Sequence, residues 1–385
     1  TVVDFFEIRF GIPAGLIAAV IMLSVYIGWT GSLLVSLGFI LHTITGISAN
    51  TAIIIGTIIV FIYTMAGGMW AVSLTDFFQM IIVMTGLTVI TPIVISEVGG
   101  FSVLISRLPE GSFRMTPETG DSIDWLNYIR AWMVIGLGNL AGQDLLQRSL
   151  SAKSEKVAQN SAYLSTIIYL SFGLLPVLIG MAGSLLIPGL DNPELVVPKL
   201  ALNYLPPVLA SVFISALLAA VMSSADSSIL ACSSVLGKNL LPMVMKSVPD
   251  NIILKWTRLS VPIFAIFSMI VALFVGEVYT LLLDSFSILL VGLFVPLTAG
   301  IWWPKANTPA ALSAMILGFL AWIVFKFITP EVPSDMVGLA FSISAMILVT
   351  LFTKDKEIAN PLKDVDGNIL PYVDRLGILF SFNKK

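Results

Sequence analysis

Ten apolar stretches, separated by short polar segments, divide the chain between residues 13 and 353. A transmembrane α-helix needs about 20 mainly apolar residues, and we count ten stretches that qualify. The pattern therefore predicts an all-α membrane protein with ten transmembrane helices. The predicted spans are 13–41, 51–66, 77–98, 125–147, 160–187, 208–236, 257–275, 278–301, 309–329 and 335–353.

Arginine and lysine residues are distributed unevenly between the two sides that these spans define. When successive loops are assigned to alternate sides, fifteen of the 20 fall on the side that holds both ends of the sequence, and five fall on the other. Positive residues accumulate on the cytoplasmic side of membrane proteins. We therefore expect both ends in the cytoplasm, a membrane domain over 1–353, a cytoplasmic tail over 354–385, and larger external loops at 97–124 and 188–207.

Composition supports the membrane prediction and narrows the functional classes. Hydrophobic residues make up 57% of the chain and charged residues 11%, whereas soluble domains carry about 25% charged residues. A net charge of −3 without a basic cluster argues against a nucleic-acid partner. Cys232 and His42 are single, which excludes a disulfide framework and a histidine-based triad. Phosphate-loop, dinucleotide and zinc motifs are missing, so we expect neither an enzyme nor an ATP-driven pump.

Asp76 is the first ionisable residue that the pattern places at a membrane span. Gly67 and Gly68 predict a tight cytoplasmic turn between two spans, so Asp76 and Thr75 should stand near the start of the next helix. A carboxylate there accepts hydrogen bonds from free N–H groups and complements the helix dipole. Ionisable groups within membranes are also functional candidates. Both interpretations of Asp76, helix cap and functional group, are open from the local sequence.

The sixth predicted span carries a carboxylate and several hydroxyls. Asp226 lies roughly 27 Å along this helix, in its inner half. At helical spacing Ser223, Asp226 and Ser227 share one face, and Ala220 and Ser224 share a neighbouring one. Such oxygens suit a hard monovalent cation. Small-residue packing with serines bonded to the preceding turn is the alternative; it accounts for the serines and alanines but not for Asp226.

The fourth predicted span combines glycines with polar side chains. Gly136, Gly138 and Gly142 lie within seven residues, and several polar residues follow them. This pattern predicts an interrupted helix, and interrupted helices expose backbone groups to substrates in many transporters. A continuous, glycine-packed helix with a polar cytoplasmic end is the alternative.

Three segments carry a resemblance to a known family: AGGMWAVSLTDFFQ (66–79), QRSLSAK (147–153) and AAVMSSADSSIL (219–230). They resemble the sodium/solute symporter family, which includes the sodium–glucose, proline, pantothenate, sialic acid and choline carriers. The third segment is the most specific, and its residues are closest to those of the choline-transporter-like branch. The resemblance covers nearly the whole chain.

The resemblance implies a core of two five-helix inverted repeats with two peripheral helices. On this mapping the span at 13–41 is the third core helix, and the first core helices would precede Thr1. We therefore expect that the chain is truncated at its N-terminus.

The resemblance also implies a sodium site near the midplane, held by the first and eighth core helices. The eighth-helix share corresponds here to the carbonyl of Ala220 and the hydroxyls of Ser223 and Ser224. Sodium would thus be the co-transported ion.

Family members that use a second sodium ion add an aspartate from the fifth core helix and further side chains of the eighth. The corresponding residues are Asp76, Asp226 and Ser227. Some relatives carry serine where this chain has Asp226, so one-ion and two-ion stoichiometries both stay open.

The substrate site follows from the same mapping. Gly142 stands where the choline carriers have tryptophan, so the identity of the solute is left open. Aromatic residues here can also be core or interface residues. The residues best placed to line the solute, on the third core helix and the interrupted helix, are Tyr26, Trp29, Trp132, Asn139 and Gln143.

The predicted function is sodium-coupled symport of a small organic solute by alternating access, in the plasma or inner membrane. The expected partners are the solute and the lipid bilayer, with no nucleic acid, and the oligomeric state is not predicted. Three alternatives stand beside it: a proton-coupled carrier of the same fold, the transporter-like sensor domain of a signalling protein, and a channel or purely structural bundle.

Overall fold

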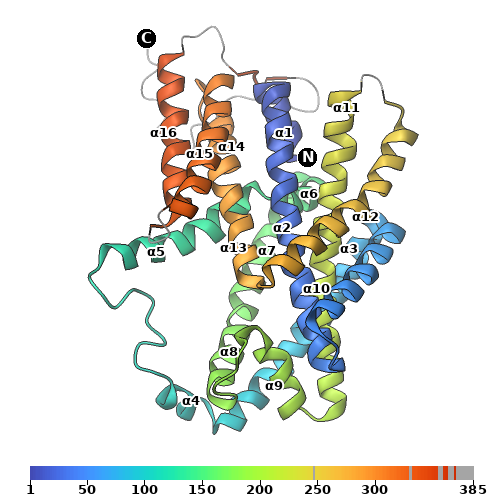
Figure 1. Ribbon diagram of the computed structural model, residues 1–385, viewed down its shortest axis with the longest axis vertical. Helices are drawn as coiled ribbons and strands as arrows, with labels where there is room; N and C mark the ends of the chain where they lie inside the picture. Colours follow the sequence, from blue (N-terminus) through green and yellow to red (C-terminus); the bar gives the residue numbers. More distant parts are fainter. Residues whose placement is uncertain (246–247, 329–331, 354–358, 363–367, 370–385) are drawn as a thin grey trace.

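The chain folds almost entirely into helices, as predicted, and most long helices run roughly along the long axis of the molecule (Figure 1). The computed structural model describes residues 1–245, 248–328, 332–353, 359–362 and 368–369, and it describes residues 63 and 66–72 by their backbone alone. Most of the predicted tail at 354–385 lies outside these ranges. The helices are α1 (Val2–Phe10), α2 (Ile12–Thr45), α3 (Ala49–Val98), α4 (Phe101–Arg107), α5 (Ser122–Met133), η1 (Val134–Gly138), η2 (Asn139–Ala141), α6 (Gln143–Leu150), α7 (Glu155–Phe172), α8 (Leu174–Leu186), η3 (Pro193–Leu195), α9 (Val196–Tyr204), α10 (Pro207–Val235), η4 (Leu236–Leu240), α11 (Leu241–Val244), α12 (Asp250–Val275), α13 (Val278–Leu289), η5 (Leu290–Phe294), α14 (Val295–Trp302), α15 (Thr308–Ile328) and α16 (Ser334–Phe352).

Eight helical segments among the described residues are long and apolar enough to cross a membrane. Each coincides with one of the ten predicted spans. The remaining two predictions correspond to a shorter apolar helix, Ala49–Ile62, and to the interrupted stretch from α5 to α6, so the count of ten stays a prediction. The eight segments are Ile12–Thr45, Ser73–Val98, Glu155–Leu186, Pro207–Val244, Asp250–Val275, Val278–Trp302, Thr308–Ile328 and Ser334–Phe352.

The prediction of a non-helical tight turn at Gly67 and Gly68 is wrong, because the backbone of α3 is helical from Ala49 to Val98. Glycine disfavours a helix by only about 1 kcal/mol relative to alanine, so two glycines do not by themselves end one. The predicted change of direction is nevertheless present within α3, as its contacts with α2 show.

The two halves of α3 return to the same end of α2. Ile53 packs against Gly38, and Ile90 belongs to the same apolar cluster as Ile40. A straight helix would separate residues 53 and 90 by about 55 Å, whereas Gly38 and Ile40 are two residues apart. The chain therefore reverses direction inside α3, between its darker blue start and its cyan end (Figure 1). Sharp bends in helices occur where glycines lie together.

The interruption predicted in the fourth span is confirmed. Helix α5 gives way to the π-helical turn η1 and the 3₁₀ turn η2, and Gly142 then adopts an extended conformation (φ −68°, ψ 129°) before α6 begins. The alternative of one continuous helix is thereby excluded. Helix α5 lies across the long axis of the molecule, unlike its neighbours (Figure 1).

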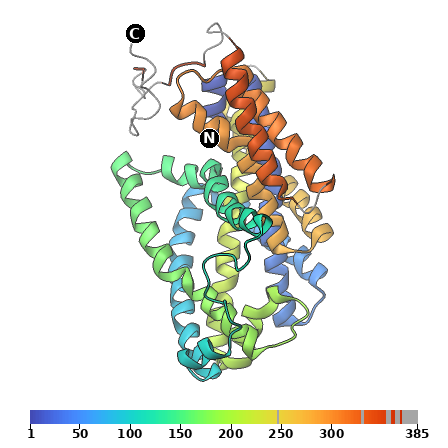
Figure 2. The ribbon, with the colours of Figure 1, turned by 90° about the vertical axis from the view of Figure 1, so that its left-hand side faces the viewer.

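Helix α2 lies at the centre of the fold, between α3, α10, α12 and α13. Its glycines allow this close packing: a Cβ atom on Gly28 would lie 2.7 Å from Ser285 Oγ, and one on Gly31 would lie 3.2 Å from the Ser268 carbonyl oxygen. Small residues let membrane helices approach in this way. In contrast, α7 has no buried residue and lies at the edge of the bundle (Figure 2).

Arg9 joins the start of the chain to its end. The side chain is buried, and its guanidinium donates to the carbonyl oxygens of Gly300 (3.0 Å), Ala359 (2.8 Å) and Asn360. The backbone N–H of Asn360 donates in return to the Arg9 carbonyl at 2.9 Å. Residues 359–360 are thus fixed against α1 and α14.

Candidate functional site

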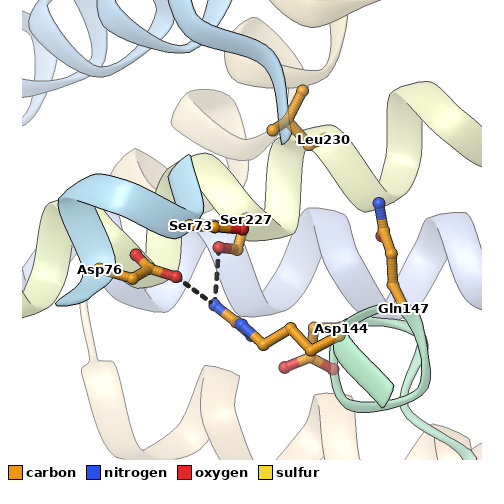
Figure 3. Close-up of a pocket in the computed structure, with 7 residues that line it drawn as sticks. Ser73, Asp76, Asp144, Gln147, Ser227 and Leu230 are labelled. Carbon is orange, nitrogen blue, oxygen red and sulfur yellow. Dashed lines mark hydrogen bonds and ion pairs between the residues drawn. The ribbon is translucent and has the colours of Figure 1, made fainter. Parts of the chain in front are cut away.

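Polar side chains from α3, α6 and α10 meet in one place, which we call the Asp76 cluster: Asp76, Arg148, Ser223 and Ser227. Asp76 Oδ1 accepts a hydrogen bond from Ser223 Oγ, and Asp76 Oδ2 accepts one from Arg148 Nη2 at 2.9 Å. The same Arg148 nitrogen lies 2.9 Å from Ser227 Oγ. Figure 3 shows the two dashed lines from Asp76 and Ser227 converging on the guanidinium.

The position of Asp76 decides between its two interpretations. Helix α3 begins at Ala49 with Ser48 as its N-cap, so Asp76 lies well inside the helix and does not cap it. Its carboxylate bonds instead to side chains of two other helices. Asp76 is therefore part of a tertiary polar site.

Helix α10 presents its hydroxyls and its carboxylate as the helical spacing predicted. Ser227 Oγ lies 2.9 Å from the Ser223 carbonyl oxygen, one turn earlier, and 3.4 Å from Asp226 Oδ1. Back-bonding of this kind was the alternative account of the serines, and Ser227 shows it. Its hydroxyl nevertheless also accepts from Arg148, so the bond within the helix does not remove it from the cluster.

Asp226 is the one carboxylate on α10, and it is completely buried (0% exposed). Oδ2 has no hydrogen-bond partner among the described residues. Burying an ionised carboxylate without full pairing costs several kcal/mol. An added cation beside Asp226 would offset that cost, so this oxygen is a natural ligand for one.

A small pocket of about 10 Å³ opens beside the cluster. A volume of this order holds roughly one water-sized particle, which also suits a single small cation. The lining residues are Ser73, Asp76, Asp144, Gln147, Arg148, Ser227 and Leu230.

Ala220 and Ser224 lie on α10, and both are half-buried. The Ser224 carbonyl oxygen accepts from Ser228 Oγ at 2.7 Å. The two residues stand one turn apart, as predicted, next to the cluster on the same helix. Their role in sodium binding stays a prediction.

Two of the predicted substrate residues make buried contacts. Tyr26 (2% exposed) on α2 donates its hydroxyl hydrogen to Asp144 Oδ1 at 2.5 Å and accepts from the Asp144 backbone N–H at 2.9 Å. Gln143 is also buried, and its Oε1 accepts from the backbone N–H of Val2 at 2.7 Å. The structure therefore uses these polar atoms for contacts between helices.

The other three predicted substrate residues differ in their surroundings. The Trp29 ring packs against Phe286, with 5.3 Å between ring centroids. Trp132 on α5 is 62% exposed, and Asn139 is half-buried in η2. The binding of solute by these five residues stays a prediction.

Sequence reasoning missed the role of Arg148, which it treated as one of many cytoplasmic charges. One signal was present: Arg148 follows Asp144 by four residues, so both share a face of the helix after the break.

The sequence analysis also did not foresee a second arginine–aspartate pair. We call it the Asp335 cluster: Asp335, Arg130 and Ser287, from α16, α5 and α13.

The sequence profile of the sodium:solute symporter family matches residues 1–318 of this chain. The chain belongs to the sodium:solute symporter family. It is therefore a multi-pass membrane protein, and the members it matches are transporters, not enzymes.

Two relatives illustrate the breadth of this family. The high affinity choline transporter 1 of Homo sapiens is 27% identical over 303 residues, 75% of this chain and 52% of that protein. The sodium/pantothenate symporter of Escherichia coli (strain K12) is 28% identical over 338 residues, 82% of this chain and 69% of that protein. The chain spans about half to two thirds of the length of such relatives.

The fold is that of a solved symporter. The structure of the substrate-bound outward-open state of a Na⁺-coupled sialic acid symporter superposes with a TM-score of 0.75 over 93% of this chain and 78% of that one. The sequence identity is 21%, so this likeness concerns the fold alone.

Proposed function

We propose that the protein couples the inward movement of sodium to the uptake of a small organic solute by alternating access. The observation that carries this proposal is the Asp76 cluster beside Asp226. Asp76 and Ser227, from separate helices, line a pocket sized for a single small ion. Ser223 bonds to Asp76 and Asp226 lies beside Ser227, so two further oxygen-bearing side chains adjoin that pocket. Membership of a sodium:solute symporter family supports sodium as that ion.

Two ion sites fit this proposal. One consists of the Ala220 carbonyl with the hydroxyls of Ser223 and Ser224, and the other adds Asp76, Asp226 and Ser227. Sodium bound at these oxygens would stabilise the conformation that binds solute, and by linkage the solute would raise the affinity for sodium. We also propose that both ends of the chain lie in the cytoplasm, which the excess of positive residues on that side supports.

The substrate class is a small organic molecule, and choline and pantothenate are the first solutes to test. High affinity choline transporters and sodium/pantothenate symporters are among the relatives. Trp29 and Trp132 supply aromatic faces of the kind that bind a quaternary ammonium group. Proline, betaine, sialic acid and sugars complete the panel.

Uptake by proteoliposomes tests the coupling. An inward sodium gradient is expected to drive accumulation of at least one solute, and replacement of sodium by potassium should abolish it. A panel without any sodium-dependent uptake would reject the proposal. A pH gradient without sodium serves as a second arm, because the unpartnered oxygen of Asp226 is also where a proton would bind; accumulation in that arm alone would favour a proton-coupled carrier.

Ser224→Ala tests the first ion site. It should raise the half-saturating sodium concentration about tenfold, because the ion loses one oxygen ligand. Ser215→Ala, an exposed serine on the same helix, is the matched control and should leave sodium dependence unchanged. Equal sodium dependence in Ser224→Ala and the unsubstituted protein would remove Ser224 from the site.

A further inference from the structure

The hydroxyl of Tyr26 makes two hydrogen bonds to one residue of another helix. It donates to Asp144 Oδ1 and accepts from the backbone N–H of Asp144. Helix α6 starts at Gln143, and its N-cap, Gly142, has no side chain to cap the free N–H groups of the first turn. Such groups need an acceptor. Tyr26 on α2 therefore supplies from outside the cap that α6 lacks.

The first turn of α6 also fixes the position of Arg148. Helix α6 has only eight residues, and an extended glycine precedes it, so few bonds along the chain hold it in place. Arg148 lies four residues after Asp144, on the same face of the helix. Its guanidinium reaches Asp76 Oδ2 and Ser227 Oγ. The bonds that anchor Asp144 therefore help to set how Arg148 meets the Asp76 cluster, together with the bond between Gln143 and the backbone N–H of Val2.

The guanidinium and a sodium ion need the same oxygens. Arg148 carries a fixed positive charge and contacts two of the atoms that the second ion site would use. A tethered group competes according to its effective concentration, which falls when its tether becomes looser. Anchoring α6 therefore favours the guanidinium over the ion.

We propose that Tyr26 is a positioning residue that holds Arg148 on the Asp76 cluster and thereby lowers the sodium affinity of that site. The proposal rests on the proposed function, since it concerns the same ion site. It assigns the Tyr26 hydroxyl to ion binding through Arg148 and not to contact with the solute.

The decisive experiment is a double-mutant cycle on the sodium dependence of uptake in proteoliposomes. Arg148→Gln removes the competing charge and should lower the half-saturating sodium concentration about tenfold. Tyr26→Phe keeps the ring but loses both hydrogen bonds, and should lower it about threefold. The double variant should match Arg148→Gln alone, because Tyr26 acts only through Arg148. The Michaelis constant for solute at saturating sodium should stay the same in Tyr26→Phe.

Two outcomes of the cycle would overturn the proposal. Independent effects, with the two fold-changes multiplying in the double variant, would show that Tyr26 does not act through Arg148. A changed Michaelis constant for solute with unchanged sodium dependence would make Tyr26 a substrate residue. The control is Tyr169→Phe, at an exposed tyrosine of α7, which should reproduce the unsubstituted protein.

Hydrogen exchange separates this proposal from the proposed function. Tyr26→Phe should speed exchange of the backbone amides of residues 143–150 about tenfold and leave α13 unchanged, since the bonds that are lost are the two that Tyr26 makes to α6. Unchanged exchange in α6 would reject the anchor even where sodium-dependent uptake is found. Faster exchange without any sodium-dependent uptake would reject the proposed function instead, and with it the effect on sodium affinity.

A second variant guards against misfolding of Tyr26→Phe. Asp144→Asn preserves the ring packing and the bond from the backbone N–H, and weakens the bond from the Tyr26 hydroxyl. Because Asp144 also lines the pocket beside the Asp76 cluster, this variant is assessed by hydrogen exchange and not by sodium dependence. Exchange of the backbone amides of residues 143–150 should speed up by less than in Tyr26→Phe, and unchanged exchange would contradict the anchor.

Discussion

Among the described residues, two arginine–aspartate pairs each bond to a serine, and they differ in how deeply the pair is buried. In the Asp335 cluster, Asp335 is fully buried; Oδ2 lies 2.6 Å from Arg130 Nε and 3.0 Å from Ser287 Oγ. Oδ1 accepts from the backbone N–H of Met336 at 3.0 Å. Both oxygens are therefore used, and three helices are tied together.

The Asp76 cluster has the same residue types in a more open setting. The Asp76 side chain is 21% exposed and that of Arg148 is 49% exposed. A pocket adjoins the pair, and the neighbouring Asp226 carries an oxygen without a partner. We infer that the buried Arg130–Asp335 pair has a structural role. The more exposed Arg148–Asp76 pair adjoins the unpartnered oxygen of Asp226, so a sodium ion could replace the guanidinium there.

Asp335→Ala should produce the largest loss of stability. The substitution removes a fully buried carboxylate and leaves Arg130, the Ser287 hydroxyl and the backbone N–H of Met336 without their acceptor. Breaking a pair with a buried member costs roughly 3 kcal/mol. Unfolding of the purified protein by denaturing detergent measures the loss. Asp191→Ala, at an exposed loop residue, provides the control, and an equally small loss in both variants would contradict the structural role.

Asp76→Asn should affect sodium dependence strongly and stability only slightly, in contrast to Asp335→Ala. The half-saturating sodium concentration is expected to rise at least tenfold, because one charged ligand is lost. The unfolding free energy should change by less than about 1 kcal/mol, since an exposed ion pair contributes little. Uptake and unfolding are measured on the same preparation. A large loss of stability with unchanged sodium dependence would make the two clusters equivalent.

The serines allow a matched comparison at single-hydroxyl resolution. Ser287→Ala should cost about 1 kcal/mol of stability, the usual net value of one hydrogen bond, without changing sodium dependence. Ser223→Ala should raise the half-saturating sodium concentration about fivefold with little effect on stability. A loss of stability in Ser223→Ala together with a change of sodium dependence in Ser287→Ala would contradict the distinction between a structural cluster and an ion-binding one.

The smallest effect is expected at the pair between Lys326 and Asp284. Their side chains are 34% and 33% exposed, so Asp284 is more exposed than Asp335 or Asp76. Lys326 Nζ also lies 5.0 Å from the Trp322 ring centroid. Lys326→Gln should cost roughly 0.5–1 kcal/mol, measured by the same unfolding assay. A loss as large as that of Asp335→Ala would show that exposure does not govern the strength of these pairs.

The sequence predicted those features that depend on spacing along one helix. Ser223, Asp226 and Ser227 share a face of α10 because the helical period puts them there, and the glycines at 136–142 predicted the break before α6. Pairing between helices was a different matter. Family resemblance placed Asp76 with α10, and the structure joins it to Ser223 across 147 positions.

What could not be predicted depended on packing between distant segments. The local sequence of Gln143 does not indicate which donor bonds to its Oε1. The backbone N–H of Val2 is that donor because α1 lies beside α6. The sequence predicts that Arg148 is one of the cytoplasmic charges. Hydropathy indicates the depth of a residue in the membrane, but not which neighbours its side chain contacts. The continuous helix through Gly67 likewise reflects backbone preferences too small to read from two glycines.

The contact of Arg9 with residues 359 and 360 sets an order of events during biosynthesis. Its guanidinium finds the last of its three carbonyl acceptors only after some 350 further residues have been made. Before residues 359 and 360 are synthesised, Arg9 on α1 lacks these two acceptors. These contacts can therefore form only after all the intervening helices have been synthesised, and a chain that ends before residue 359 lacks two of the carbonyl acceptors of Arg9.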